Sequence, residues 1–481
     1  MCKRPESITG PIKKQETNMK QTTATKTFRY MVLSTCLLAA MSHGAQVSVY
    51  LRAGTTTLTM ADGRQILMWG FAKDSGPSVQ DGTITVPGPA LELGPDTQSL
   101  VIHLKNTLPE AVSVVIPGQF AIQGDPERNP DGRVRSFTHE ASPGGTATYT
   151  WPDIQPGTYF YHSGSHPALQ VQMGLYGSVT RLAGFGEAYD GVRFEREITL
   201  LFGEIDPDLH DAVASDNYGP EKTVTSTLKY SPQYFLINGV SYTNGLLPVF
   251  AGRPGDRILL RLLNAGIDYR IPTLNGGYFS LISEDGNLLP YPRETYTAML
   301  PPLKTMDALF TVAPEAPPQT FALYDRRLGL VNSTSMEAGG MLTHLDVSTP
   351  EVPTNVPASW VTTYFGPGPS YPPGTTGPLD DPDGDGINNL NEYIAGTNPN
   401  NDLSFLRIIA LSPPDPEGTV VTFSDTAAGR LYNLESSTNL LTGVWTVIHT
   451  NIPGYAGAMW LTDSQPATSR FYRVKATYMG P

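Results

Sequence analysis

The sequence predicts an all-β protein built from several sandwich or barrel domains. Gly 47 and Pro 43 together make up about 19 % of the 481 residues, against about 12 % in average usage. Charged residues account for only 16 %, where about 25 % is typical. Long exposed helices need many Glu, Lys and Arg, so this composition argues against coiled coils and helical solenoids. The hydrophobic content of 40 % excludes a disordered chain, and the length allows about three domains.

Short runs of apolar and β-branched residues alternate with turn clusters, which is the pattern of β-sandwich domains. In residues 46–185 the predicted strands are Thr56–Met60, Thr83–Val86, Leu100–Leu104, Val112–Ile116 and Ala147–Trp151. In residues 186–349 they are Ile198–Phe202, Tyr234–Ile237, Arg257–Leu263 and Thr320–Tyr324. Residues 350–379 are rich in Pro, Gly, Thr and Ser and predict an extended linker. A small β domain is predicted for residues 403–481, with strands at Leu406–Leu411, Thr419–Phe423, Leu431–Glu435 and Phe471–Ala476.

The first two β segments share a local pattern. Ser99–Asn106 (SLVIHLKN) and Arg257–Asn264 (RILLRLLN) each follow a Gly/Pro/Asp turn and end in Asn. The spacing of 158 residues between the two Asn suits tandem domains of similar size. Two unrelated strands with a similar end are the alternative.

Residues 1–45 predict an N-terminal extension and an export signal. Three basic residues between positions 20 and 29 precede the apolar run Met31–Met41, and small residues follow at Gly44 and Ala45. The run is too short to span a bilayer, which needs about 20 residues. We expect translation to start at Met19 and cleavage near Ala45, which makes the protein periplasmic, extracellular or attached to the cell surface. A buried helix or a retained anchor is the alternative.

The cysteine count limits the chemistry of the processed chain. The two cysteines are Cys2 and Cys36, and both precede the predicted cleavage site. A processed chain therefore has no disulfide, no thiolate nucleophile and no Cys-ligated metal.

Residues 380–402 contain an acidic loop, and residues 381–392 read DPDGDGINNLNE. The expected calcium ligands are at loop positions 1, 3, 5, 7, 9 and 12, the seventh being a main-chain carbonyl: Asp381, Asp383, Asp385, Ile387, Asn389 and Glu392. Gly386 lies at position 6, where the chain must turn sharply. We predict a Ca²⁺ site, a following helix over Asn389–Ala395 that ends at Gly396, and a structural role for the ion. A solvated acidic turn without metal is the alternative.

Several ordered motifs in the first two segments resemble the multicopper oxidase family. They are TVPGP at 85–89, NTL at 106–108, GTYFYH at 157–162, GLYG at 174–177, FLING at 235–239, RLLNAG at 261–266, EDG at 284–286 and GGM at 339–341. The resemblance covers about 300 residues. It implies tandem cupredoxin-like, plastocyanin-like Greek-key β-sandwiches at 46–185 and 186–349, and copper-dependent oxidation coupled to reduction of dioxygen.

The residues at the family's copper positions depart from its pattern. A blue copper centre needs a Cys thiolate, which the processed chain lacks. Where the family has its first His-x-His pair, this chain has Val115 and Pro117, and at the second pair it has Gly164 and His166. Val, Pro and Gly side chains cannot bind copper, so the resemblance does not carry the four-copper chemistry with it.

A reduced copper site is the remaining route to oxidoreductase activity. His162, His166 and Met173 lie on the loop where simple cupredoxins hold copper, and imidazole and thioether ligands suit that metal. Gln170 could face the same loop. The alternative is a hydrogen-bonded loop inherited from the family without its metal.

Two classes of function follow, and the first is the main prediction. In the first class the protein is exported, keeps a structural calcium ion and binds an unknown ligand or envelope partner without oxidase chemistry. In the second class it is a copper-dependent oxidoreductase that uses the reduced site. Residues 432–440 (YNLESSTNL) and 471–474 (FYRV) of the tail resemble C-terminal β modules of large bacterial secreted proteins. The net charge of −13 argues against a nucleic-acid partner, no segment after the signal could span a membrane, and a homo-oligomer is left open.

Overall fold

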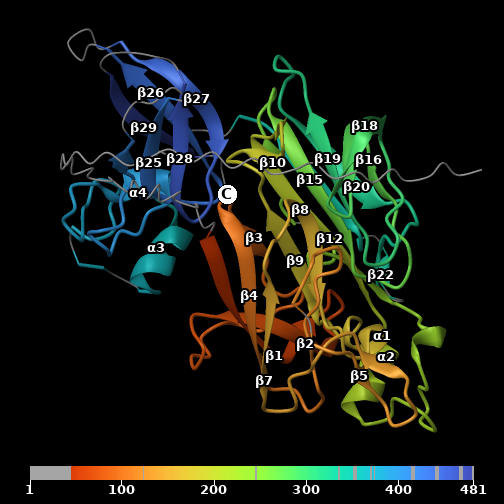
Figure 1. The fold of residues 1–481 in the computed structure, drawn as a ribbon. Helices are drawn as coiled ribbons and strands as arrows, with labels where there is room; N and C mark the ends of the chain where they lie inside the picture. Colours follow the sequence, from red (N-terminus) through yellow and green to blue (C-terminus); the bar gives the residue numbers. More distant parts are fainter. Residues whose placement is uncertain are drawn as a thin grey trace, which may run out of the picture. The chain divides into compact units, whose positions relative to one another are not determined.

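The computed structural model describes residues 45–122, 124–243, 246–333, 336–337, 339–349, 355–368, 371–372, 374–412, 418–438, 444–464 and 470–478. The predicted signal segment, both cysteines and part of the predicted linker lie outside these residues. Strands far outnumber helices in the described chain, and the prediction of an all-β fold with tandem cupredoxin-like sandwiches is confirmed (Figure 1).

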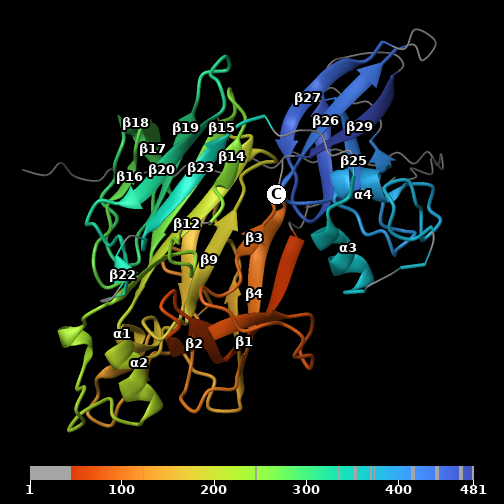
Figure 2. The same cartoon turned by 180° about the vertical axis from the view of Figure 1, so that it is seen from behind.

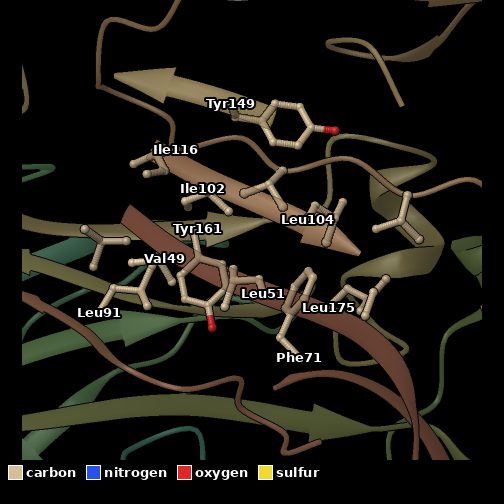
Figure 3. Close-up of a cluster of buried hydrophobic side chains, with 14 of the residues drawn as sticks. Val49, Leu51, Phe71, Leu91, Ile102, Leu104, Ile116, Tyr149, Tyr161 and Leu175 are labelled. Carbon is tan, nitrogen blue, oxygen red and sulfur yellow. The ribbon is translucent and has the colours of Figure 1, made fainter. Parts of the chain in front are cut away.

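The first sandwich packs a four-stranded sheet against a three-stranded sheet. The first sheet has the order β2 (Gln65–Asp74), β1 (Ala45–Thr59), β4 (Thr97–Asn106) and β7 (Thr146–Trp151). The second has the order β3 (Leu91–Leu93), β9 (Tyr176–Arg181) and β8 (Gly157–His162). Their facing side chains, among them Leu51, Ile102 and Tyr161, form a buried core (Figure 3). Shorter elements are β5 (Glu127–Arg128), β6 (Val134–Ser136), α1 (Pro167–Gln170), β10 (Glu187–Tyr189) and β11 (Val192–Arg193).

The second sandwich is larger. One sheet has the order β13 (Tyr234–Ile237), β12 (Arg196–Ile205), β15 (Arg257–Asn264), β19 (Thr305–Thr311), β17 (Phe279–Glu284) and β18 (Asn287–Thr295). The other has the order β14 (Val249–Gly252), β23 (Leu342–Val347), β20 (Gln319–Asp325) and β16 (Pro272–Leu274). Shorter elements are helix α2 (Pro207–Ala214), the 3₁₀ turn Thr227–Lys229, β21 (Val331–Ser333) and β22 (Met336–Glu337).

The two sandwiches repeat the same strand connections, as the paired sequence pattern predicts. β1 runs parallel to β4 and β4 antiparallel to β7, while β12 runs parallel to β15 and β15 antiparallel to β19. β15 is buried along nearly its whole length, Arg261 included, because both of its faces are covered. Leu260 and Leu262 point into the core of the second sandwich, whereas Leu263 lies in a cluster shared with Phe160 of the first.

Two predicted strands are wrong. Thr83–Val86 makes only an isolated bridge between Thr85 and Phe71. Val112–Ile116 bridges Ala141 through Val112 and His162 through Val115, so no single partner strand extends the pairing. Local β propensity is overridden because each segment passes between different neighbours.

Among the described residues after position 355, two helices precede two three-stranded sheets. The sheets have the orders β24 (Ile408–Leu411), β25 (Thr419–Thr426), β28 (Gly457–Asp463) and β27 (Thr446–Pro453), β26 (Arg430–Ser437), β29 (Phe471–Tyr478). The predicted helix appears as α4 (Asn389–Ala395), capped by the side chain of Asn388 and ended by Gly396 at φ 83. Figures 1 and 2 both place α4 beside these sheets.

The prediction of an extended linker over residues 350–379 is wrong in part. Residues Ala358–Phe365 form helix α3. These eight residues contain no proline. The ring of Trp360 packs against Tyr393 of α4 at a centroid distance of 5.9 Å. Tertiary contact with an aromatic partner therefore stabilises a helix that composition alone does not favour.

Candidate copper and calcium sites

His162 ends β8 and is almost completely buried. Its backbone pairs with Val115 through two hydrogen bonds of 2.9 and 3.0 Å. Ring atom Nδ1 donates to the carbonyl of Ser163 at 2.9 Å, and Nε2 has no hydrogen-bond partner among the described residues. Burial lowers the pKa of His162, which favours a neutral imidazole. This ring has one free nitrogen lone pair.

The other two predicted copper ligands lie in different surroundings. His166 precedes α1 with φ 37, and its side chain is 48 % exposed, with Nδ1 at 3.9 Å from Glu110 Oε2. Met173 is fully buried in the apolar core that contains Phe71 and Leu175. The structure therefore places His162, His166 and Met173 in three environments: a buried polar loop, the half-exposed start of a helix and an apolar core.

The side-chain amide of Gln170 is also hydrogen-bonded within the protein. Its Nε2 donates to the carbonyl of Ala111 at 2.9 Å, and its Oε1 accepts from Ser163 Oγ at 2.6 Å. These bonds fix the turn between β8 and β9 and occupy the amide that the sequence allowed to face a metal.

Three buried serine hydroxyls lie beside the expected copper positions. Ser113 Oγ is 3.0 Å from Ser136 Oγ, and Ser165 Oγ donates to both at 3.1 and 3.2 Å. A Cβ at Gly164 would lie 2.9 Å from Val115 Cγ1 and 3.0 Å from Ser113 Oγ. Close packing and hydroxyl bonds therefore fill this region, and a larger side chain at position 164 has no room.

The acidic loop brings carboxylates together. Ligand atoms of Asp381, Asp383 and Asp385 lie within 4.8 Å of one another, and within the described residues this is the one such group of three or more His, Cys, Asp or Glu. Asp381 accepts the backbone N–H groups of Gly384 and Gly386 at 2.9 and 3.0 Å. Those two glycines have φ 80 and 91, a region that favours glycine, so the loop can wrap around its own side chains.

Helix α4 adds two completely buried side chains to the loop. Asn389 Nδ2 donates to the carbonyls of Thr375 and Gly377 at 3.0 and 2.9 Å, which leaves Asn389 Oδ1 without a partner. Glu392 Oε1 accepts from Thr397 Oγ1 at 3.3 Å, and Glu392 Oε2 has no partner. Burial, and then the neighbouring Asp383 and Asp385 charges, raise the pKa of Glu392 to about 8.

Several buried oxygens in and beside the acidic loop have no hydrogen-bond donor in the described part of the chain. Four buried oxygens lack a hydrogen-bond partner among the described residues: Asp383 Oδ2, Asp385 Oδ2, Asn389 Oδ1 and Glu392 Oε2. Buried polar atoms are normally satisfied, and an unsatisfied set indicates an absent water or ion. Oxygen-only donors of this number suit a hard cation such as Ca²⁺. Ile387 donates its N–H to Asp385 Oδ1 at 2.7 Å, and a role for its carbonyl stays a prediction.

Comparison with known proteins gives the family. Two models, both described as multicopper oxidase, match residues 79–180 and 197–344, together just over half of the chain. The chain belongs to the multicopper oxidase family. Copper resistance protein A of Escherichia coli is 27 % identical over 241 residues, covering 42 % of this chain and 38 % of that protein. Multicopper oxidase MmcO of Mycobacterium tuberculosis is 26 % identical over 287 residues, covering 54 % and 52 %. This multicopper oxidase family member thus spans 38 % and 52 % of the two relatives.

Solved structures support the same fold. A blue copper oxidase from Nitrosomonas europaea matches with a TM-score of 0.50 and 17 % identity, covering 63 % of this chain and 86 % of that one. The multicopper oxidase mgLAC matches with a TM-score of 0.50, again at 17 % identity, covering 64 % and 89 %. None of the helices in the described part of the chain has the length and apolar character needed to cross a bilayer.

The family implies copper, but the donor set described for the first sandwich does not fit the family's copper centres. Val115, Pro117 and Gly164 offer no side-chain donor, and His166 is half exposed beside Glu110. The serine cluster was not predicted because its members come from three segments far apart in sequence and carry no motif.

Proposed function

We propose that this multicopper oxidase family member is an exported protein without the family's oxidase activity, and that it serves as a calcium-stabilised binding protein of the cell envelope. One observation carries the proposal. At the four copper positions of the first sandwich, three side chains lack donor atoms and the adjacent space holds the hydroxyls of Ser113, Ser136 and Ser165. In this proposal the β-sandwich fold of the family is kept, and residues without metal-binding atoms replace its copper ligands.

Calcium is the metal that the described residues fit best. The three aspartates of the loop converge, and the two α4 side chains add buried, unpartnered oxygens. Ca²⁺ accepts six to eight oxygens at flexible angles, whereas copper prefers imidazole and sulfur donors. The calcium ion would neutralise this group of carboxylates and hold the loop against α4.

Elemental analysis and oxygen uptake test the proposal together. The secreted, purified protein is supplied with copper and calcium, dialysed and measured for both metals, and its oxygen consumption is followed with a phenolic substrate. We expect about one calcium per chain, no stoichiometric copper and no substrate-dependent oxygen uptake. N-terminal sequencing of the same material is expected to find a start near Gln46.

The copper-dependent alternative predicts a different result from the same material. Stoichiometric copper that is lost in His166→Ala, but kept in His449→Ala, would overturn the non-oxidase proposal. His449 is the matched control because it lies in the tail, where its Nε2 contacts the carbonyl of Thr462 at 2.8 Å. One observation favours this alternative: Nε2 of His162 has no hydrogen-bond partner among the described residues and could bind a metal.

A further inference from the structure

Helix α4 contacts both the acidic loop and the small β domain of the tail. It carries the Asn389 and Glu392 side chains of the acidic loop, and its other end is bonded into the small β domain of the tail. Because the helix has only seven residues, it is too short to be stable on its own. Contacts at its two ends therefore decide whether it forms.

Side chains of β26 satisfy the last carbonyls of α4. Arg430 Nη2 donates to the carbonyl of Tyr393 at 2.6 Å, and the Tyr432 hydroxyl donates to the carbonyl of Ala395 at 3.0 Å. Tyr432 is fully buried in the core of the β domain, and its hydroxyl also accepts the N–H of Ala427 at 2.9 Å. If α4 unfolds, these buried donors lose their acceptors, which costs free energy.

β29 holds the same helix through an aromatic contact. The Tyr393 hydroxyl donates to the Tyr478 hydroxyl at 2.5 Å, and the two ring centroids are 4.9 Å apart. The Arg430 guanidinium lies over both rings, at 5.7 and 4.7 Å from their centroids. Closely packed elements on both sides leave α4 little freedom to shift without disturbing β26 and β29.

The opposite end of α4 carries buried oxygens of the acidic loop. Asp383, Asp385 and Glu392 bring negative charge together, and their inner oxygens lack a described partner. Without a bound cation these buried oxygens stay unsatisfied, which opposes the buried position of Glu392 and therefore the helix. We propose that cation binding at the acidic loop stabilises the C-terminal β domain by fixing α4 against β26 and β29. This inference rests on the calcium site proposed above and adds the route by which the site acts.

Hydrogen exchange of the full chain tests the coupling. Backbone exchange is compared at about 100 times the calcium Kd and in excess chelator, with calcium binding measured separately by calorimetry. A ligand that binds only the closed form multiplies the equilibrium constant for closing by 1 + [L]/Kd. We therefore expect the amides of β26 and β29 to exchange about 100-fold more slowly with calcium. Strands β1 and β4 of the first sandwich should not change.

A pair of conservative variants separates the coupling from the site. Tyr432→Phe removes the hydroxyl that contacts α4, so it should keep calcium binding while reducing the calcium-dependent protection of β26 and β29. Tyr455→Phe is the matched control, because its hydroxyl donates within the β domain to the carbonyl of Ala458 and has no α4 contact. It should behave like the wild type.

Each remaining outcome has one meaning. If calorimetry shows calcium binding but exchange in β26 and β29 stays the same, the coupling is overturned and the calcium site stands. An equal loss of protection in both Tyr variants would also overturn the proposed route. If the wild type binds no calcium, the site and the coupling both fall.

Discussion

Asn106 and Asn264, 158 residues apart, make the same three kinds of hydrogen bond in the two sandwiches. Asn106 Nδ2 donates to the carbonyls of Glu110 and Ala141 at 2.7 and 2.9 Å, and its Oδ1 accepts the N–H of Leu108 at 2.9 Å. Asn264 repeats the set with Asp268, Leu300 and Gly266 at 2.7, 3.0 and 2.9 Å. Each Asn thus ends its strand and ties it to the following loop, which supports a common architecture for the two domains.

The first prediction concerns these two residues. Asn106→Ala and Asn264→Ala each remove one fully buried amide and leave two carbonyls and one N–H without that partner. We expect each to lower the free energy of unfolding by about 1–3 kcal/mol, measured by urea denaturation. Asn287→Ala is the control, because that exposed side chain makes one local bond and should change stability by less than about 0.5 kcal/mol. Equal effects in all three variants would contradict the shared structural role.

The second prediction concerns the polar contact between the sandwiches. Thr158 of β8 donates its hydroxyl to Asp307 Oδ1 of β19 at 2.5 Å, and the buried Arg261 donates to the same hydroxyl at 2.7 Å. Tyr189 and Ser283 both donate to Asp307 Oδ2. Arg261 keeps its closer ion pair with Glu197 at 2.7 Å, so Asp307→Ala mainly leaves three buried hydroxyl donors without their acceptor. We expect it to lower the free energy of unfolding by about 1–3 kcal/mol.

A surface carboxylate provides the control for Asp307. Asp131 pairs with Arg133 in an exposed turn, and such pairs contribute little. Asp131→Ala should therefore shift the denaturation midpoint only slightly. A small effect of Asp307→Ala under the same conditions would show that the network does not hold the two sandwiches together.

The third prediction tests the packing around Gly164. Gly164→Ala adds a Cβ that would lie 2.9 Å from Val115 Cγ1, and such overpacking typically costs about 1–3 kcal/mol. The second substitution Val115→Ala removes that clash, so the double variant should be less unstable than the two single effects added together. Thermal and urea unfolding of the four proteins give the coupling energy. If the effects of the two single substitutions simply add in the double variant, the alanine at position 164 does not clash with Val115.

The fourth prediction is a pH dependence that comes from His210 on α2. Burial lowers the pKa of His210, and its Nδ1 donates to the carbonyl of Leu67 at 2.8 Å while Nε2 has no described partner. The charged groups near it are Asp206 and Asp211, and Asp211 pairs with Arg64. The hydrogen bond to the Leu67 carbonyl and then the two aspartates oppose the fall in the pKa of His210, but burial outweighs them.

The sign follows from proton linkage. Below about pH 6.5 the unfolded chain protonates His210 whereas the folded chain does not, so stability falls as the pH drops from 6.5 toward the lower folded pKa. The slope for one proton approaches about 1.4 kcal/mol per pH unit. His210→Gln should reduce the slope between pH 7 and 5.5, measured by urea unfolding at fixed calcium. An unchanged slope would assign the pH dependence to other groups.

Much of the fold could be predicted from the sequence because its signals are local. The strand Tyr234–Ile237 and the helix Asn389–Ala395 have the predicted bounds, since hydrophobic runs, caps and glycine stops act within a few residues. The predicted strands Thr83–Val86 and Val112–Ile116, and the predicted linker around α3, were wrong for the opposite reason. Their conformation depends on partners distant in the chain.

The sequence by itself determined the family resemblance, the all-β character and the identity of Val115, Pro117 and Gly164, whose side chains have no metal-binding atom. It also supplied the acidic spacing of residues 381–392. Only the tertiary structure decided that His162, His166 and Met173 lie in separate environments, and that Ser113, Ser136 and Ser165 hydrogen-bond to one another. It also decided that Asn389 and Glu392 are buried with unpartnered oxygens on a helix bonded to β26. Burial and hydrogen-bond satisfaction are non-local properties, because they depend on chain segments that only folding brings together.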